Sequence, residues 1–217
     1  MRKWLKHKQN PEDYARKEAE LWAWLQIAAQ QSKFQVVFGD ESGFSLTPSV
    51  PYGWQAKGER VCLPTARSKR ESVFGLLSHD NRLATYYTDQ KIDSAFVIES
   101  VDKFLVTQPD KRGRPAVTLL VLDNASIHVS KTFRTACQRW EEQGLLVWYL
   151  PTYGPHLNRI ERLWLRTKYS CGSPPGLKAA DYTTMKTLKE ALKRIFDQFG
   201  EHYSIKFKIP EVSINST

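Results

Sequence analysis

The sequence predicts an α/β fold in which a mixed β-sheet carries helices on both faces, and two observations lead to this class. From about residue 93 onward, helix-like and strand-like segments alternate, which is typical of βαβ units. Before them, three strand-like segments follow one another, and this favours antiparallel pairing. We therefore expect three antiparallel strands followed by parallel ones, with functional sites where strands end and loops gather.

The first third of the chain predicts a helix and then three strands. Asn10 followed by a proline is a helix start, and nothing breaks the helical pattern before about Gln31. Next comes KFQVVFGDES, an apolar run of strand length that is expected to end at Asp40. The strand-like segments ESVFGLLS and RLATYYTD then flank residues 79–81, which indicate a hairpin turn.

The rest of the chain predicts helices and strands in alternation, followed by a helix pair. A helical cap at Ser130 and a helix stop at Gly144 bound one of them. The expected elements are a helix over 93–106, a strand VTLLVLD over 117–123, a helix over 130–144, a strand LLVWYL over 145–150, and helices over about 157–169 and 185–199.

The composition narrows the functional classes. The chain has 32 Lys and Arg residues and 23 Asp and Glu residues, which gives a net charge of +9. Such an excess either keeps the protein soluble or indicates a polyanionic partner. The three cysteines and five histidines form no ligand-like cluster in the sequence, which argues against a zinc site or a disulfide framework. No apolar run is long enough to span a bilayer and no secretory signal is evident, so we expect a soluble protein of the cytoplasm.

Two aspartates follow apolar strands directly. Asp40 closes the strand VVFG, and Asp123 closes LLVL in the stretch LLVLDNASIH. If these strands are neighbours, both carboxylates emerge at the same edge of the sheet and repel each other unless a cation lies between them. Mg²⁺ or Mn²⁺ would suit such oxygen ligands.

Glu161 is a third candidate acid, in PHLNRIERLW. Leu157, Ile160 and Trp164 form the apolar stripe of this helix, and Glu161 sits beside it, with Asn158 on the same side. A charged side chain at the margin of a buried face is costly unless it is paired or binds metal. Two metal ions held by three such acids suit in-line displacement at phosphorus.

Each acid also has an ordinary interpretation when taken alone. Asp40 or Asp123 could cap a loop, and Glu161 could pair with a neighbouring basic residue on a solvated helix face. A hydrolytic triad of Ser126, His128 and Asp123 is disfavoured because no nucleophile elbow surrounds the serine. Only the joint arrangement of the three acids indicates metal chemistry.

Three stretches together resemble the DDE transposases of bacterial insertion sequences in the mariner superfamily, in particular the insertion-sequence six-thirty group. They are FGDESGFSLTPSVPYGW, LLVLDNASIH and LPTYGPHLNRIERLW, and the resemblance runs from about residue 34 to 207. It implies a ribonuclease-H-like fold and the metal-dependent cutting and joining of DNA. By position, Asp40, Asp123 and Glu161 match the family's acidic triad, which holds two Mg²⁺ or Mn²⁺ ions. Gly154 and Arg159 depart from the family's usual serine and proline.

The resemblance also sets expectations for domains and partners. It implies a helical lead-in over 1–33, a catalytic domain over 34–208 and a tail over 209–217. The lead-in is too short for the helix-turn-helix region with which relatives recognise transposon ends. The implied partners are transposon-end and target DNA, with a homodimer as the active complex, and the implied setting is a bacterial cytoplasm, at the nucleoid when bound to DNA.

Further polar and aromatic residues are assigned to DNA or to the surroundings of the acids. Asn124 and His128 are expected to orient Asp123 or a phosphate, with structural polar contacts as the alternative. Asn158 is expected either to hydrogen-bond metal-bound waters in support of the acids or simply to begin the helix. Tyr52 and Trp54 could stack on a base, although core packing is the more usual fate of such side chains. The expected phosphate-binding residues, for which a solvated charge run is the alternative, are Arg112, Arg114, His128, Arg159, Arg162 and Lys168.

Two other functions remain compatible with the sequence. A ribonuclease-H-like nuclease acting on hybrid or branched DNA would keep the same chemistry. A DNA-binding remnant of a transposon would keep the charge but not the catalysis. Cleavage of different DNA substrates separates the first from a transposase, and metal-dependent cutting separates the second.

Overall fold

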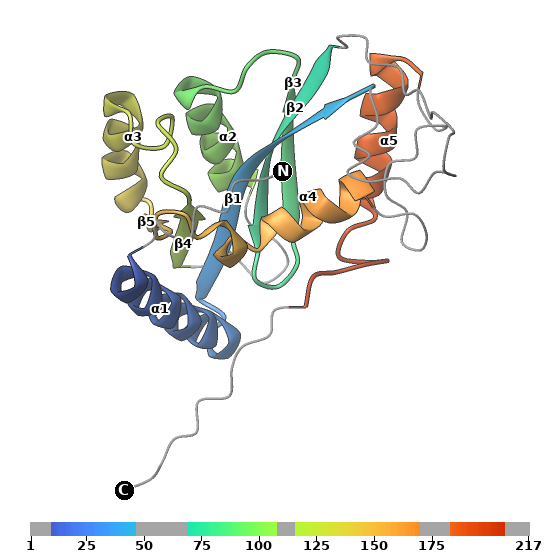
Figure 1. Ribbon diagram of the computed structural model, residues 1–217. Helices are drawn as coiled ribbons and strands as arrows, with labels where there is room; N and C mark the ends of the chain where they lie inside the picture. Colours follow the sequence, from blue (N-terminus) through green and yellow to red (C-terminus); the bar gives the residue numbers. More distant parts are fainter. Residues whose placement is uncertain (1–9, 47–68, 108–115, 170–182, 207–217) are drawn as a thin grey trace, which may run out of the picture.

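The computed structural model describes residues 10–46, 69–107, 116–169 and 183–206. Within them, five strands form one mixed sheet with helices on both faces (Figure 1), which confirms the expected fold class. The strands are β1 (Phe34–Ser45), β2 (Arg70–Ser78), β3 (Leu83–Thr88), β4 (Val117–Leu122) and β5 (Leu145–Tyr149). The helices are α1 (Pro11–Gln30), α2 (Ser94–Thr107), α3 (Lys131–Glu141), the 3₁₀ turn η2 (Pro155–Leu157), α4 (Ile160–Tyr169) and α5 (Met185–Asp197).

The sheet has the order β3-β2-β1-β4-β5, and its pairing changes from antiparallel to parallel at β1. β2 pairs antiparallel with β1 and with β3, whereas β4 pairs parallel with β1 and with β5. In the turn between β2 and β3, Asn81 has a positive φ of 65°, a conformation that asparagine tolerates better than most residues. β4 and β5 are joined through α3, the crossover that a parallel pair requires.

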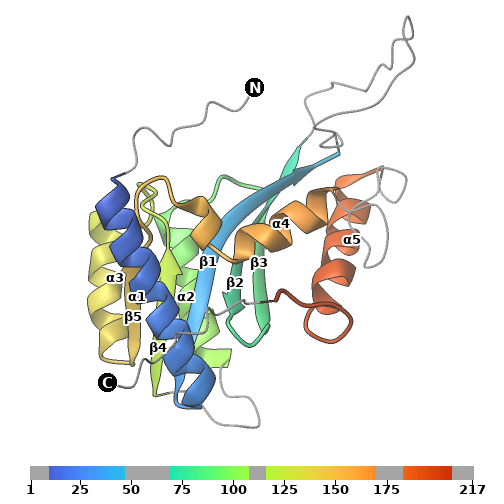
Figure 2. The ribbon, with the colours of Figure 1, turned by 60° about the horizontal axis from the view of Figure 1, so that its bottom comes forward.

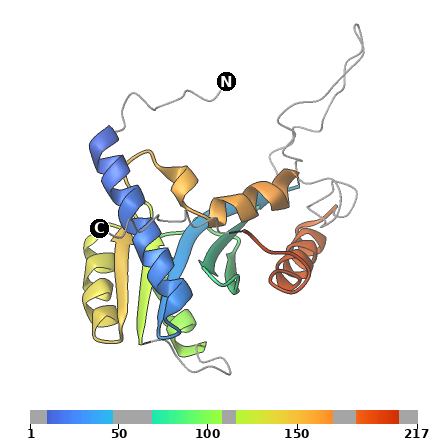
Figure 3. The same cartoon turned by 90° about the horizontal axis from the view of Figure 1, so that it is seen from below.

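The two faces of the sheet carry separate apolar cores. Because side chains alternate along a strand, Val36 and Phe38 of β1 face one core and Val37 faces the other. α1, α4 and α5 cover the first face, and they follow one another across it in Figures 2 and 3. α2 and α3 cover the second face. The sheet is therefore the middle layer of three.

α4 lies close to the sheet because one strand residue has no side chain. A Cβ atom on Gly75 of β2 would lie 2.7 Å from the Trp164 ring and 2.8 Å from Ile160 Cδ1. Glycine thus lets α4 pack directly on the backbone of β2. This approach brings the beginning of α4 over the centre of the sheet.

α1 has the cap that the sequence predicts and packs into the first core. The Asn10 side chain accepts hydrogen bonds from the backbone N–H groups of Glu12 and Asp13, at 3.0 and 3.3 Å. Leu21 and Leu25 are fully buried in the same core as α4 and α5. The helix before residue 34 is thus part of the same packed unit as the sheet.

Two element boundaries differ from expectation. β1 does not end at Asp40 but continues to Ser45, because β2 remains its hydrogen-bonded partner over this length after β4 has ended. The expectation was wrong because the glycines and serines of this stretch are weak strand formers, and the pairing with β2 outweighs that preference. The helix expected from Leu157 begins at Ile160, after the short turn η2.

Among the described residues, no helix is both long and apolar enough to cross a membrane. Four sequence interpretations fall outside the described residues. They concern Arg112 and Arg114 as phosphate-binding residues, and Tyr52 and Trp54 as stacking or packing residues.

Candidate active site

Asp40 lies where β1 loses one of its two partner strands. The pairing of β1 with β4 stops at Phe38, opposite Val121, while the pairing with β2 continues and sets Asp40 opposite Gly75. By the alternation along β1, Asp40 shares the face of Phe38, which α4 covers. Its Oδ2 atom accepts a hydrogen bond of 3.0 Å from Trp164 Nε1 on α4.

Asp123 lies beside Asp40 at the end of β4. It stands two residues beyond Val121, as Asp40 stands two residues beyond Phe38, so the parallel register places the two at the same level. Its side chain is 50% exposed. The Oδ1 atom accepts hydrogen bonds from the backbone N–H of Ala125 at 2.9 Å and from His128 Nδ1 at 2.8 Å.

Glu161 lies in the first turn of α4, the helix that packs over Asp40. Two contacts fix this end of the helix on β1: Asn158 Nδ2 donates to the carbonyl oxygen of Gly39 at 3.0 Å, and Trp164 donates to Asp40. Glu161 lies between the two anchors in sequence. The helix N-terminus also favours an ionised carboxylate there.

The pKa of Asp40 indicates how closely the acids are gathered. Burial raises this pKa well above its usual range, and the negative charges of Glu161, Glu41 and Asp123 raise it further, while a hydrogen bond from the backbone of Glu41 opposes them. The charges of both other members of the expected triad therefore act on the pKa of Asp40. Asp123 and Glu161 are thus within electrostatic range of Asp40.

The residues fit a divalent metal by the chemistry of their donors. All three offer hard oxygen ligands, and the crowded negative charge that raises the pKa of Asp40 would be relieved by a cation. In the described part of the chain, however, no three Asp, Glu, His or Cys side chains stand together as a ready-made ligand cluster. Asp40 Oδ2 and Asp123 Oδ1 are instead held by Trp164 and His128. Metal binding would draw on the other carboxylate oxygens or on a rotation of these side chains.

His128 joins Asp123 to a fourth acid, Glu41. The imidazole is fully buried, with Nδ1 at 2.8 Å from Asp123 Oδ1 and Nε2 at 2.8 Å from Glu41 Oε1. Burial lowers the pKa of His128, but its hydrogen bonds and charge interactions with the two carboxylates outweigh this and raise the pKa to about 9. The ring is thus an imidazolium cation at neutral pH. It cross-links the end of β4 to β1.

The same contacts act on Asp123. Burial raises its pKa, but the hydrogen bonds from His128 and from the backbone of Ala125 outweigh burial, and the net pKa lies below the usual range. Asp123 is therefore ionised over the whole neutral range. Tyr149 holds the loop from the other side, since its hydroxyl donates to the carbonyl oxygen of His128 at 2.7 Å.

Glu41 is the residue of the site that sequence reasoning missed. It directly follows Asp40, and the alternation of side chains along β1 points it to the opposite face, toward α2 and α3. The length of β1 would have revealed this role. If β1 continues past Asp40, the side chains of Asp40 and Glu41 must lie on opposite faces of the sheet.

Two of the expected DNA-binding residues are buried. His128 is inaccessible and holds Asp123, which corrects its assignment as a DNA contact and agrees with the alternative that it orients this acid. Arg159 is also buried, and its guanidinium lies over the Trp22 ring of α1 at 4.7 Å. Such stacking suits a weakly hydrated guanidinium, so Arg159 joins α1 to the start of α4.

The remaining expected residues lie around the site. Arg162 is exposed on α4 and Lys168 is partly exposed, with its ammonium 5.4 Å from the Phe44 ring. Asn124 donates from Nδ2 to the carbonyl oxygen of Leu150 at 2.6 Å and so joins the loops after β4 and β5. Asn158 is buried, and its Oδ1 atom has no hydrogen-bond partner among the described residues.

A mixed sheet of this order, with an acid within β1, another directly after β4 and a third on the helix packed over the sheet, is the architecture of a ribonuclease-H-like domain. Comparison with known proteins places the chain within this class. Residues 35–186 match the family described as DDE superfamily endonuclease. The chain belongs to this family.

A curated relative and several solved structures agree with this assignment. The chain is 31% identical over 133 residues to the insertion element IS630 uncharacterized 39 kDa protein of Shigella sonnei, which covers 59% of this chain and 36% of that protein. It resembles the catalytic domain of Mos1 mariner transposase with a TM-score of 0.55 and 14% identity, covering 92% of this chain and 94% of that one. The match to a Mos1 mariner paired end complex with Mn has a TM-score of 0.61 and 14% identity, over 91% of this chain and 58% of that one.

These matches differ in what they establish. At 14% identity, the likeness to the Mos1 structures shows a shared fold. The chain spans about a third of the length of the Shigella sonnei relative and somewhat more than half of the Mos1 chain in the paired end complex.

Proposed function

We propose that this chain is the catalytic part of an insertion-sequence transposase that cleaves DNA strands and joins the freed 3′-hydroxyl to target DNA. The observation that supports the proposal is that the charges of Asp123 and Glu161 both act on Asp40, which Trp164 ties to α4. Membership of the DDE superfamily endonuclease family supports it, as do similar structures, which include a Mos1 transposase paired-end complex with left transposon end and the Mos1 Strand Transfer Complex.

The proposed cofactor is Mg²⁺ or Mn²⁺, two ions per site, held by Asp40, Asp123 and Glu161. Two of the similar structures are titled as Mos1 paired end complexes with Mn and with Mg, which supports this choice. When bound, such ions activate the attacking oxygen and stabilise the leaving oxygen of an in-line displacement. Asp40 would serve both ions, because it interacts electrostatically with each of the other two acids.

The residues around the acids would set the geometry of the reaction. Trp164 holds one oxygen of Asp40 and His128 holds one oxygen of Asp123, which would leave the remaining oxygens to bind the metal ions. Holding carboxylates in fixed orientations lowers the cost of organising the site during the reaction. The contact of Asn158 with β1 would hold the start of α4 in place, and the contact of Asn124 with the loop after β5 would hold the two loops together.

DNA is the proposed partner, as transposon ends and target, within a homodimer in the bacterial cytoplasm. Arg162 and Lys168 on α4, together with Arg112 and Arg114, would contact phosphates. The excess of basic residues in the chain supports this binding. We propose the division 1–33, 34–208 and 209–217 as lead-in, catalytic domain and tail.

The experiment that tests the function is DNA cleavage by the Asp123→Asn variant. Wild-type protein with Mn²⁺ or Mg²⁺ should nick supercoiled and insertion-element DNA, and the variant should lose this activity by a factor of at least about 10³, because a metal ligand is gone. Urea denaturation would show that the variant folds. Cleavage at the wild-type rate by a folded variant would disprove the proposal.

Three substrates would separate the proposed function from its rivals. A transposase should prefer insertion-element ends and yield joined products, whereas a ribonuclease-H-like nuclease should prefer RNA–DNA hybrids or branched DNA. A DNA-binding remnant should bind all of them in a salt-dependent manner and cut none.

A further inference from the structure

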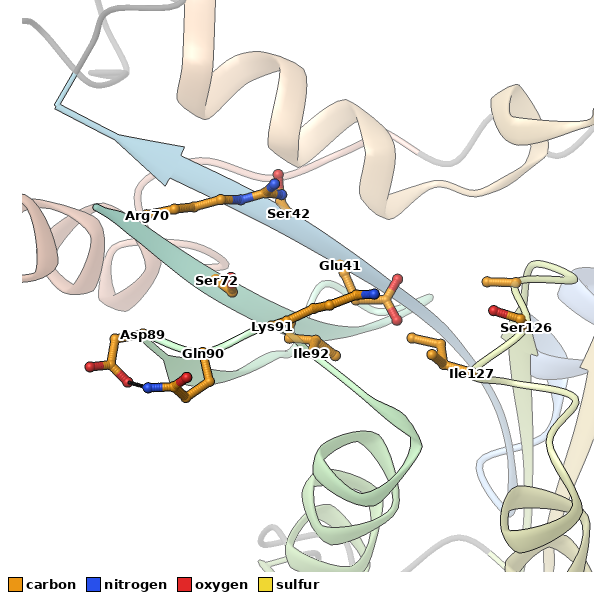
Figure 4. A pocket seen from close by; sticks show the side chains of 11 residues that line it. Glu41, Ser42, Arg70, Ser72, Asp89, Gln90, Lys91, Ile92, Ser126 and Ile127 are labelled. Atoms are coloured by element: carbon orange, nitrogen blue, oxygen red, sulfur yellow. Dashed lines mark hydrogen bonds between the residues drawn. The ribbon is translucent and has the colours of Figure 1, made fainter. Parts of the chain in front are cut away.

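A cavity lies beside the loop that follows Asp123, on the side of β1 toward which Glu41 points. Its volume is about 480 Å³, in the range of small-molecule sites. Side chains from β1, β2, the loop after β3 and the loop after β4 line it (Figure 4). We call it the Arg70 cavity, after the basic residue at the start of β2.

The Arg70 side chain lies against the backbone of Gly43, a residue without a side chain. A Cβ atom on Gly43 of β1 would lie 1.5 Å from Arg70 Nε and 2.0 Å from Arg70 Cζ, so the guanidinium occupies the space that any other residue at position 43 would fill. Gly43 pairs with Ser72 of β2. Ser72 and Ser42, the residue before Gly43, both line the cavity. The lack of a side chain at position 43 therefore leaves room for the guanidinium over β1, beside the cavity.

The other lining groups suit a nucleotide. Lys91 and Ser126 are exposed and add an ammonium and a hydroxyl, while Ile92 and Ile127 add apolar surface for a base (Figure 4). Two acids also line the cavity. Glu41 lies 2.8 Å from His128 Nε2, and the carboxylate of Asp89 accepts a hydrogen bond from Gln90 Nε2 at 3.3 Å.

The cavity adjoins the acids through one loop. Ala125 lines the Arg70 cavity and also a cavity of about 380 Å³ that Asp123 lines, so the loop from Asp123 to Ile127 separates the two. A DNA strand with its scissile phosphate at Asp123 would pass over this loop. Its neighbouring nucleotide would then enter the Arg70 cavity.

We propose that the Arg70 cavity binds one nucleotide of single-stranded DNA next to the scissile phosphate, with Arg70 and Lys91 on its phosphate and its base against Ile92 and Ile127. The inference rests on the proposed function, since it takes DNA as the substrate. The cavity is too small for a duplex, so it selects for an unpaired nucleotide at the cleavage site.

The test compares two fluorescent probes of arbitrary sequence, a blunt duplex and the same duplex with a short single-stranded overhang. Binding is measured by anisotropy in EDTA, where metal-dependent cleavage does not occur. Arg70→Gln should weaken overhang binding about tenfold and reduce the slope of log K against log salt by about 0.7, the value for one phosphate contact on a single strand. Binding of the blunt duplex should change no more than in Lys131→Gln, a matched loss of an exposed cation on α3.

A second variant tests whether the position of the Arg70 guanidinium matters, without any change of charge. Gly43→Ala should displace Arg70 and weaken overhang binding as Arg70→Gln does, and the double variant should be no weaker than Arg70→Gln alone, because both changes act through one contact. Circular dichroism would confirm that the variants fold. Overhang binding by Arg70→Gln equal to that of Lys131→Gln, or equal losses for overhang and blunt probes, would overturn the inference.

Cleavage by Asp123→Asn separates this inference from the proposed function. If that variant loses metal-dependent cleavage while Arg70→Gln binds the overhang normally, the function stands and the cavity assignment fails. If Asp123→Asn cleaves normally while Arg70→Gln and Gly43→Ala bind the overhang weakly, the cavity still binds DNA and the assignment of the catalytic acids fails.

Discussion

Replacement of His128 by asparagine should change how the stability of the protein depends on pH. In the folded protein the pKa of His128 is raised to about 9, because two carboxylates hold the buried ring. In the unfolded chain the pKa of a histidine is about 6.5. A group whose pKa is raised on folding contributes stability that is fully present below the unfolded pKa and is lost as the pH rises through the folded pKa.

The size of this effect follows from the difference between the two pKa values. At about 1.4 kcal/mol per pKa unit, the wild-type protein should lose about 3 kcal/mol of unfolding free energy between pH 6 and pH 10 through this group. The His128→Asn variant should lack this loss, although its buried carboxylates, left without their cation, should make it less stable at pH 6.

Urea denaturation in EDTA at a series of pH values measures both effects. The control is His202→Gln, which removes a solvent-exposed histidine. If wild type and His128→Asn give parallel profiles from pH 6 to pH 10, the imidazolium between Asp123 and Glu41 is not the state of the folded protein, and the reasoning is refuted.

Two further predictions follow from the crowding of the site. Asp40→Asn should be more stable than wild type to thermal denaturation in EDTA, because it removes a carboxylate that burial and the charges of three other carboxylates disfavour. It should also lose most of the stabilisation of about 2.7 kcal/mol that wild type gains from Mg²⁺ at a hundred times its Kd. An equal gain in both proteins would argue against Asp40 as a ligand. Gly75→Ala should lower the unfolding free energy by about 1–3 kcal/mol in urea, because its Cβ would press on Trp164, and it should also weaken cleavage by moving α4; unchanged stability would show that α4 has room to shift.

Most of the fold could be predicted from local patterns. The cap at Asn10, the apolar runs of the strands and the helical spacing after Ser130 each correspond to an observed element. The extension of β1 past Asp40 could not be predicted in this way. It depends on hydrogen bonds to β2, whose residues are remote in sequence, and local preference in this stretch points the other way.

The sequence also named the three acids, but it could not assign the residues that hold them. His128 looked like a rim residue because its spacing from Asp123 says nothing about burial, and Arg159 looked like a phosphate contact because its charge is visible and its stacking on Trp22 is not. Glu41 was overlooked because its role requires a strand that continues past Asp40.

The sequence by itself determined the type and order of the elements and the presence of one acid in the first strand and another directly after β4, because periodicity, capping and turn residues act over a few positions. Only the tertiary structure decided that Asp40 and Glu41 face opposite sides of the sheet, that His128 joins two acids, and that Gly43 seats Arg70 beside the site. These features depend on strand register and on the docking of α4, which are set by contacts between residues far apart in the chain.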